Sequence, residues 1–92
     1  MFYYIVYKTT CLVNNYIYVG VHKTKDPNIF DGYLGRGFWK HSKYYLKSPK
    51  GLLHRAIIKY GIENFKRETI KVFPGTEKGQ VDAYKLEETI VN

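Results

Sequence analysis

The chain has 92 residues and a mass of 10.9 kDa, enough for one compact domain and too short for two. Hydrophobic residues make up 45% and charged residues 25%, the proportions of a folded globular protein rather than a disordered one. No segment approaches the roughly 18 consecutive apolar residues of a membrane-spanning helix. The N-terminus also lacks the basic and apolar regions of a secretion signal. We therefore expect neither a membrane protein nor a cleaved secretory precursor.

The chain is basic and rich in tyrosine. Fifteen Lys and Arg residues against eight Asp and Glu residues give a formal net charge of +7, and tyrosine occurs ten times. Such a charge on a small body attracts polyanions, of which nucleic acid is the first candidate. A small basic ribosomal-type protein would share this composition. Cys11 is the only cysteine, which excludes an internal disulfide or a cysteine-based zinc site and suits a reducing cell interior.

The N-terminal segment predicts a β-hairpin. Residues 2–8 (FYYIVYK) and 16–22 (YIYVGVH) are rich in aromatic and β-branched residues. Asn14-Asn15 can form the turn between them, because Asn tolerates a left-handed backbone. Side chains alternate along a strand, so the second strand has two distinct faces. One face carries Tyr16, Tyr18, Gly20 and His22, and the other carries Ile17, Val19 and Val21, which we assign to the core.

The middle of the chain predicts a long loop followed by a helix. Residues 24–37 contain Asp-Pro-Asn, Asp-Gly and Gly-Arg-Gly, which are typical of a long functional or mobile loop. Residues 38–46 (FWKHSKYYL) fit either a short helix or an irregular aromatic segment. Ser48-Pro49 is typical of a helix start, apolar residues follow at helical spacing, and Gly61 ends the helix.

The C-terminal third predicts one strand and one helix. Residues 65–73 form the third strand, and Pro74-Gly75 forms a turn. The final helix begins near Thr76 and runs at least to Val91.

Glu87 is the most informative residue of this last helix. Its neighbours on the helix surface are largely apolar, namely Ala83, Tyr84, Ile90 and Val91. The side chain is therefore expected on the packed face, where an ionised carboxylate is costly without a compensating cation. A salt-bridge partner and a metal ligand fit this position equally well. Glu88, by contrast, belongs on the rim.

Several motifs together resemble the GIY-YIG nuclease family. Ile5-Val6-Tyr7 and Tyr18-Val19-Gly20 correspond to the two short triplets after which the family is named. Residues 31–37 (DGYLGRG) and 54–70 (HRAIIKYGIENFKRETI) are similar to its phage and intron-encoded, homing-endonuclease-like branch. Residues 86–91 (LEETIV) are similar to its last motif, a glutamate followed by an apolar pair, and that match selects Glu87 over Glu88. The resemblance covers nearly the whole chain.

The resemblance implies an α+β fold, with a small three-stranded antiparallel sheet flanked by helices. It implies hydrolysis of double-stranded DNA phosphodiesters with Mg²⁺, for which Mn²⁺ can substitute, inside a host or infected bacterial cell. Glu87 would be the metal ligand, and a hydrated Mg²⁺ can be held by a single carboxylate. Tyr7 would relay or accept the proton of the attacking water, which requires a nearby cation to lower its pKa from about 10. Tyr18 would orient the water or the phosphate.

The chain departs from the family pattern at two places. Ile5 stands where the family has glycine, and Arg36 lies further from the hairpin than the family's helix arginine. Arg36 is either a catalytic phosphate clamp or a loop cation that touches the DNA backbone. His22, on the Tyr18 face, and His41, five residues after Arg36, are the candidates for a proton donor or phosphate ligand. His54 is expected on a helix surface.

The remaining cations would follow a DNA strand. The predicted DNA-binding residues are Lys23, Lys25, Arg36, Lys40, Lys43 and Lys47. Residues 1–92 would form one catalytic domain, consistent with a piece of a longer chain that carries a C-terminal DNA-binding part. A non-catalytic nucleic-acid-binding module of the same fold is the alternative, and a basic RNA-binding protein is a third. The sequence leaves the oligomeric state, the target sequence and the choice between nicking and double-strand cleavage open.

Overall fold

The computed structural model describes residues 1–35, 38–39 and 51–91, and the side chains of 38–39, 51–52 and 91 are outside this description. The strands are β1 (Tyr3–Cys11), β2 (Ile17–Thr24), β3 (Tyr33–Gly35), β4 (Phe38–Trp39) and β5 (Phe65–Pro74). The helices are α1 (Gly51–Tyr60), a single 3₁₀ turn η2 (Ile62–Asn64) and α2 (Glu77–Val91). None of the described helices is both long and apolar enough to cross a membrane.

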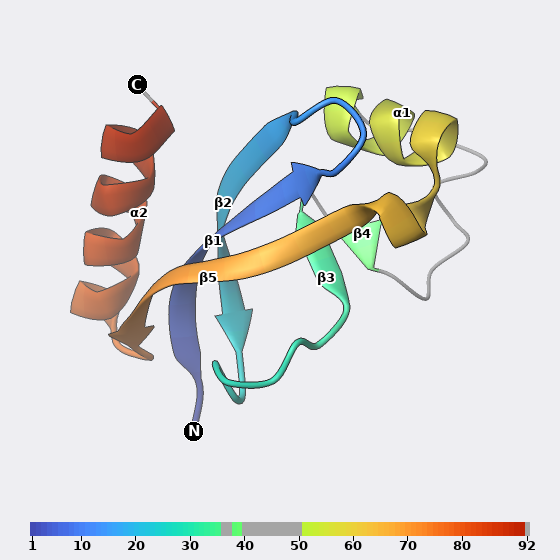
Figure 1. The fold of residues 1–92 in the computed structure, drawn as a ribbon. Coiled ribbons are helices and arrows are strands. Elements are labelled where there is room, and N and C mark those ends of the chain that lie inside the picture. Colours follow the sequence, from blue (N-terminus) through green and yellow to red (C-terminus); the bar gives the residue numbers. More distant parts are fainter. Residues whose placement is uncertain (36–37, 40–50, 92) are drawn as a thin grey trace.

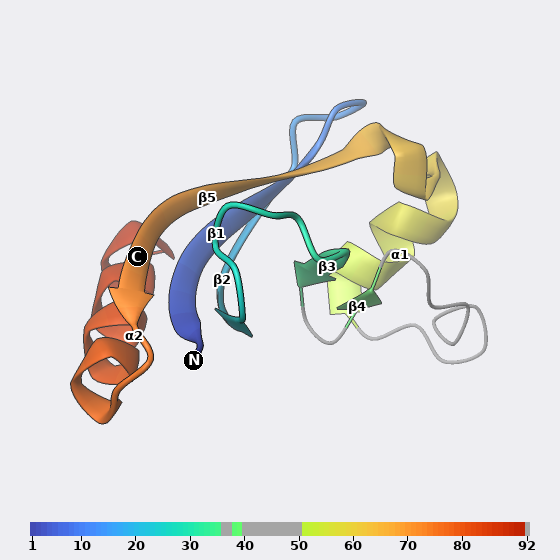
Figure 2. The same ribbon diagram turned by 90° about the horizontal axis from the view of Figure 1, so that it is seen from below.

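The centre of the fold is a three-stranded antiparallel sheet. Its strand order is β2-β1-β5, so β1 is central, and β3 and β4 form a separate two-stranded ribbon. Helix α2 covers one side of the sheet, whereas α1 and the β3–β4 ribbon lie on the other (Figures 1 and 2). The predicted α+β class is therefore confirmed.

The N-terminal hairpin forms as predicted, but the assignment of only the Ile17, Val19 and Val21 face of β2 to the core was incomplete. Asn15 takes the left-handed conformation of the turn, with φ 63°. On β2, however, Gly20 and His22 are buried, whereas Ile17 is 52% exposed. The reason is that both faces of the sheet are covered, and the Tyr18–His22 face packs under β3 and α1.

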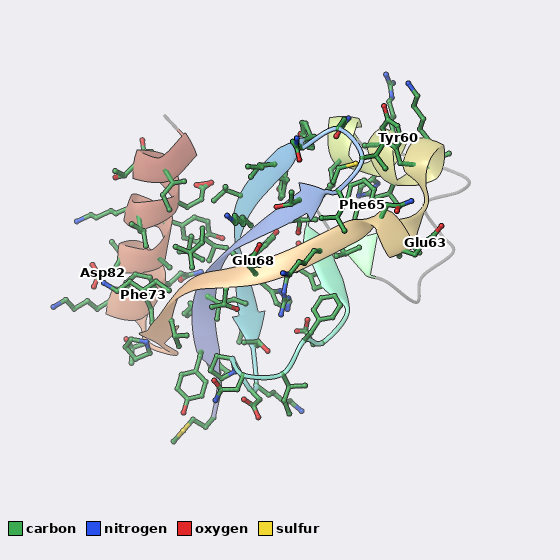
Figure 3. All side chains as sticks on the ribbon, in the orientation of Figure 1. Tyr60, Glu63, Phe65, Glu68, Phe73 and Asp82 are labelled. Atoms are coloured by element: carbon green, nitrogen blue, oxygen red, sulfur yellow. The ribbon has the colours of Figure 1, made fainter. Side chains whose placement is uncertain are left out.

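A β-bulge in β5 places its two phenylalanine side chains on opposite faces of the sheet. Its register on β1 shifts between Val6 and Tyr7, which pair with Lys71 and Thr69 and leave Ile70 unpaired. Phe65 and Phe73 would share a face in a regular strand. Instead, Phe65 lies on the side of α1 and Phe73 on the side of α2 (Figure 3).

The apolar core has two parts. On the α1 side, the buried cluster consists of Cys11, Leu34, Leu53, Ile57 and Phe65. On the α2 side, Val6 and Ala83 are fully buried. Burial of this kind contributes about 25 cal/mol per Å² of apolar surface, so the sheet is stabilised from both sides.

The helix ends follow the sequence signals. Gly61 has φ 89°, and its backbone N–H donates to the Ile57 carbonyl at 2.9 Å, closing α1 as predicted. Thr76 precedes α2, and its hydroxyl accepts a hydrogen bond from the Gly79 N–H at 3.0 Å. The predicted start at Ser48-Pro49 lies outside the described residues.

Three local predictions need correction. The segment 24–37 is not all loop, because Tyr33–Gly35 forms β3. Phe38–Trp39 forms β4 rather than the start of a helix, and the rest of 38–46 lies outside the described residues. His54 is 5% exposed rather than on the helix surface, because it lies with Leu53 and Ile57 on the buried side of α1.

Candidate active site

Tyr7 and Tyr18 lie next to each other at the middle of the sheet. Tyr7 pairs with Gly20 across the β1–β2 ladder, and the Tyr7 and Tyr18 ring centroids are 6.3 Å apart. A Cβ atom at Gly20 would lie 2.6 Å from the Tyr7 hydroxyl oxygen. The glycine of the Tyr-Val-Gly triplet is therefore explained by the space that the Tyr7 phenol occupies.

A second glycine makes room for the other tyrosine. Gly35 of β3 has φ 133°, and a Cβ atom there would lie 2.6 Å from a ring carbon of Tyr18. The backbone of β3 at Gly35 thus packs directly onto the Tyr18 ring. This contact joins β3 to the two triplets in space, although they are separated in sequence.

Tyr7 is closed off from solvent. Its residue exposure is 1%, and Tyr33 packs edge-on against it with ring centroids 5.9 Å apart. Burial, the adjacent Tyr33 and Tyr18, and a hydrogen bond with Tyr33 raise the pKa of Tyr7 far above its usual value, against a smaller opposing effect of Arg67. The expectation that a cation lowers the pKa of Tyr7 is therefore wrong for this structure, since burial outweighs the cation.

The Asp31 carboxylate connects the loop before β3 to the sheet. One oxygen lies 2.6 Å from His22 Nε2, and the other accepts hydrogen bonds from Arg67 Nη1 at 3.0 Å and the Tyr33 backbone N–H at 3.1 Å. Burial alone would raise the pKa of Asp31. The hydrogen bonds from His22 and Tyr33, with the charges of His22 and Arg67, nevertheless hold it below its usual value. Asp31 is therefore an anion at neutral pH.

Arg67 is a site residue that the sequence analysis missed. Its side chain is 3% exposed, and Nη1 also donates to the Tyr33 carbonyl at 3.0 Å. The guanidinium lies 5.9 Å from the Tyr7 ring centroid and 4.7 Å from that of Phe30. Strand periodicity from Phe65 places Arg67 on the Phe65 face, and this was the available signal.

His22 is held on two sides. Its ring stacks on Tyr33 with centroids 4.0 Å apart and planes 9° from parallel, and Asp31 engages its Nε2 atom. Only 9% of the residue is exposed. The structure thus brings the predicted residues Tyr7, Tyr18 and His22 together on one face, with Asp31 and Arg67 added to them.

Glu87 lines a separate groove at the outer edge of β2. The groove has a volume of about 610 Å³ and is lined by Tyr16, Ile17, Tyr18, Val19, Glu87 and Ile90. Because β2 is an edge strand, side chains from both faces of the sheet reach this groove. Glu87 and Tyr18 therefore border the same space, although they come from opposite sides of the sheet.

The surroundings of Glu87 distinguish it from Glu88. Glu87 is half-buried and Glu88 exposed, as expected, but Tyr84 and Ile90 beside Glu87 are 52% and 41% exposed. The face is thus only partly packed. Within the described part of the chain, no Lys, Arg or His nitrogen lies within 4.0 Å of the Glu87 carboxylate. The salt-bridge interpretation therefore has no support from the described residues.

The donor set at Glu87 fits a hydrated magnesium ion. Among the described residues, no three His, Cys, Asp or Glu side chains gather into a metal-binding group. Mg²⁺, however, usually keeps several waters and uses one or two carboxylates, for which this open groove has room. The assignment of Glu87 as a metal ligand stays a prediction.

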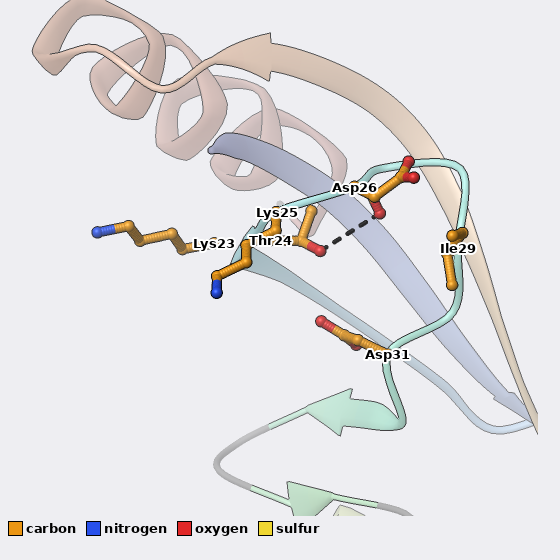
Figure 4. Close-up of a pocket in the computed structure, with 6 residues that line it drawn as sticks. All are labelled: Lys23, Thr24, Lys25, Asp26, Ile29 and Asp31. Atoms are coloured by element: carbon orange, nitrogen blue, oxygen red, sulfur yellow. Dashed lines mark hydrogen bonds between the residues drawn. The ribbon is translucent and has the colours of Figure 1, made fainter. Parts of the chain in front are cut away.

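The other predicted cations are either exposed or outside the description. Lys23 and Lys25 are exposed at the end of β2, beside a pocket of about 330 Å³ that Asp26, Ile29 and Asp31 also line (Figure 4). In this pocket the Thr24 hydroxyl donates to the Asp26 carbonyl at 3.4 Å. Four of the predicted DNA-binding residues and one histidine lie outside the described residues, namely Arg36, Lys40, Lys43, Lys47 and His41.

Comparison with known proteins finds relatives in bacteriophage T4. The chain is 46% identical over 77 residues to "Putative endonuclease segB", 36% identical over 89 residues to "Putative endonuclease segD", and 39% identical over 89 residues to "Putative endonuclease segE", all of Enterobacteria phage T4. These matches cover 84%, 97% and 97% of the chain but only 28%, 31% and 34% of the relatives, so the chain spans about a third of their length. No protein-family profile matches the chain. No solved structure matches it either. The similarity relates the chain to phage proteins named as endonucleases.

Proposed function

We propose that the chain is the catalytic domain of a metal-dependent DNA endonuclease of the GIY-YIG type, acting in a phage-infected bacterial cell. The observation that carries the proposal is the Tyr7–Tyr18 pair, which β1 and β2 hold together at Gly20. Two residues of the triplets that the sequence resembles thus meet in space. The phage T4 relatives named as endonucleases support the same activity.

The side chains on this face would bind and orient a phosphodiester. Tyr18 is half-buried, so its phenol can reach a bound phosphate or water. Tyr7 is covered by Tyr33 of β3, and its hydroxyl would therefore reach the substrate only when the Tyr33 side chain moves aside. Lys23 and Lys25, exposed at one end of β2, would neutralise the DNA backbone. Arg36, by the resemblance, would contact the reacting phosphate.

Glu87 would hold the metal ion. When bound there, Mg²⁺ would polarise the phosphate and stabilise the leaving oxygen. The half-buried carboxylate, its lack of a described cation partner and the space around it support this assignment.

Cleavage of supercoiled plasmid tests the proposal. The wild-type protein with Mg²⁺ should nick or linearise the plasmid, and EDTA should stop the reaction. Glu87→Ala should abolish cleavage, whereas Glu88→Ala removes the same charge from the neighbouring exposed position and should cleave normally. Full activity of Glu87→Ala would contradict the ligand assignment.

The same assay separates the alternatives. A wild-type protein that retards the plasmid but leaves it intact with both Mg²⁺ and Mn²⁺ would be a non-catalytic binding module. Binding should then weaken steeply with salt, because phosphate contacts release counterions. Preference for single-stranded RNA over duplex DNA would instead favour the RNA-binding interpretation.

A further inference from the structure

The connection between β2 and β3 exposes two apolar side chains that are neighbours in the chain. Ile29 is 62% exposed and Phe30 is 46% exposed. Single apolar residues on a protein surface are ordinary, but two adjacent ones form a joint apolar surface that remains in water unless a partner covers it. This pair is not part of the site built around the tyrosines.

The connection has a fixed shape before any partner binds. Residues 26–29 close a turn in which the Ile29 N–H donates to the Asp26 carbonyl at 3.3 Å and Pro27 occupies the second position. The Asn28 N–H donates to Asp26 Oδ1 at 2.9 Å. On the other side of the apolar pair, the ion pair of Asp31 anchors the chain. Because the loop is already ordered, little conformational entropy is lost when it contacts a partner.

Phe30 is anchored against the face of the sheet that carries Tyr7. The guanidinium carbon of Arg67 lies 4.7 Å from the Phe30 ring centroid and 5.9 Å from that of Tyr7. The Arg67 side chain is 3% exposed, so the Phe30 ring rests on a buried cation while nearly half of the residue stays exposed. A single guanidinium therefore separates this exposed ring from Tyr7.

The charges on the connection fit a polyanion. Lys23 and Lys25 are exposed on one side of a pocket, and Ile29 lines its other side (Figure 4). The Lys23 ammonium also lies 3.8 Å from the Phe2 ring centroid. Asp26 adds one exposed carboxylate, which the two lysines outnumber, and the other carboxylate of the connection is already matched by the buried guanidinium. DNA offers both phosphates for the lysines and apolar base faces for the exposed pair.

We propose that Ile29 and Phe30 form an apolar wedge that enters a base step of duplex DNA and partly unstacks it, while Lys23 and Lys25 bind the flanking phosphates. This inference rests on the proposed nuclease function, which supplies DNA as the partner. A duplex rises about 3.4 Å per base pair, so the distorted step would lie within a few base pairs of the reacting phosphate. The wedge would favour steps that deform easily, such as pyrimidine–purine steps.

Binding to a mismatched duplex tests the wedge without cleavage. Fluorescence anisotropy in EDTA compares a short labelled duplex with the same duplex carrying one central mismatch. The mismatch has already lost part of its stacking, so the wild-type protein should bind it roughly tenfold more tightly. A 2-aminopurine beside the mismatch should brighten further on binding, since the wedge unstacks it. The double variant Ile29→Ser, Phe30→Ser should lose both the preference and the brightening.

The turn between β1 and β2 provides a matched control. Leu12 and Val13 are also adjacent and are 58% and 55% exposed, but residues 12–16 carry no charge. The double variant Leu12→Ser, Val13→Ser should therefore keep the mismatch preference. Circular dichroism checks that each variant is folded. Ile29→Ser alone, at the more exposed position, replaces the double variant if that one unfolds, and it should weaken the preference.

The outcomes separate the wedge from the nuclease function, because cleavage is scored independently on plasmid with Mg²⁺. A wild-type protein that cuts plasmid, together with an unchanged mismatch preference in the serine variants at 29 and 30, refutes only the wedge. A wild-type protein that does not cut, but whose preference is lost in those variants, supports the wedge and refutes the nuclease function. Equal wild-type binding to both duplexes, or preference for single-stranded RNA over both, also refutes the wedge.

Discussion

Gly20→Ala probes the closest contact of the candidate site. The new methyl group would lie 2.6 Å from the Tyr7 hydroxyl oxygen and 2.9 Å from the ring carbon that carries it. The φ of Gly20 is not positive, so the backbone itself accepts alanine. The Tyr7 ring has little freedom to move, because it is 1% exposed and lies between Tyr18 and Tyr33.

Two opposing effects determine the size of the change. Replacing glycine in a strand by alanine gains about 0.5–1 kcal/mol of backbone entropy. Overpacking a filled core costs about 1–3 kcal/mol. The cost of the steric overlap should exceed the gain in backbone entropy, which leaves a net loss of roughly 1–2 kcal/mol in the free energy of unfolding. For a domain of this size that corresponds to a fall in Tm of roughly 5–15 °C.

Thermal unfolding followed by circular dichroism measures this loss, and a double-mutant cycle locates its origin. Tyr7→Phe removes the nearest atom, so Gly20→Ala should cost less in the Tyr7→Phe background than in the wild type. Tyr84→Phe is the control, because Tyr84 is 52% exposed and should show no coupling. An unchanged Tm in Gly20→Ala, or an equal loss in both backgrounds, would refute the steric argument.

Three further predictions concern stability. Arg67→Lys keeps the charge but loses the planar group that bridges Asp31 and the Tyr33 carbonyl, so urea unfolding should show a loss of about 1–3 kcal/mol. The folded-state pKa of Asp31 is lowered, so its stabilisation is present above the unfolded-state value near pH 4 and is lost as the pH falls through the folded-state value. Between pH 6 and 2.5, the Tm difference between wild type and Asp31→Asn should therefore shrink; a constant difference would contradict this. Thr76→Ala should lose about 1 kcal/mol in thermal melts, because the Gly79 N–H loses its capping oxygen.

Local sequence signals predicted the N-terminal hairpin, α1, β5 and α2, because the hairpin turn and the helix ends carry residues with specific backbone or capping preferences. Asn15 takes a positive φ in the turn between β1 and β2, and Gly61 takes one at the end of α1. Thr76 caps the N-terminus of α2. The incomplete assignment on β2 has a different origin. Alternation separates two faces of a strand, but it does not say which face is covered, and here both are. The tyrosine and histidine face therefore became the more buried one, although its residues are polar.

The candidate site was predictable where it depends on strand register and not where it depends on loop packing. The pairing of Tyr7 with Gly20 follows from the hairpin turn. The contact between Asp31 and His22 depends on how the segment before β3 folds back, which no local pattern encodes. Arg67 reaches the site through long-range pairing of β5 with β1, and such pairing is not visible in a single sequence.

The bulge at Ile70 has a consequence for solubility. β5 is a ten-residue strand at the edge of the sheet, and an exposed edge of that length can pair with the edge of another molecule. Ile70 and Val72 are both 42% exposed, which would favour such association. The bulge interrupts the regular row of backbone donors and acceptors, and the exposed Lys66 and Lys71 place like charges along it. The bulge that places side chains of β5 on both faces of the sheet thereby also protects the chain against aggregation.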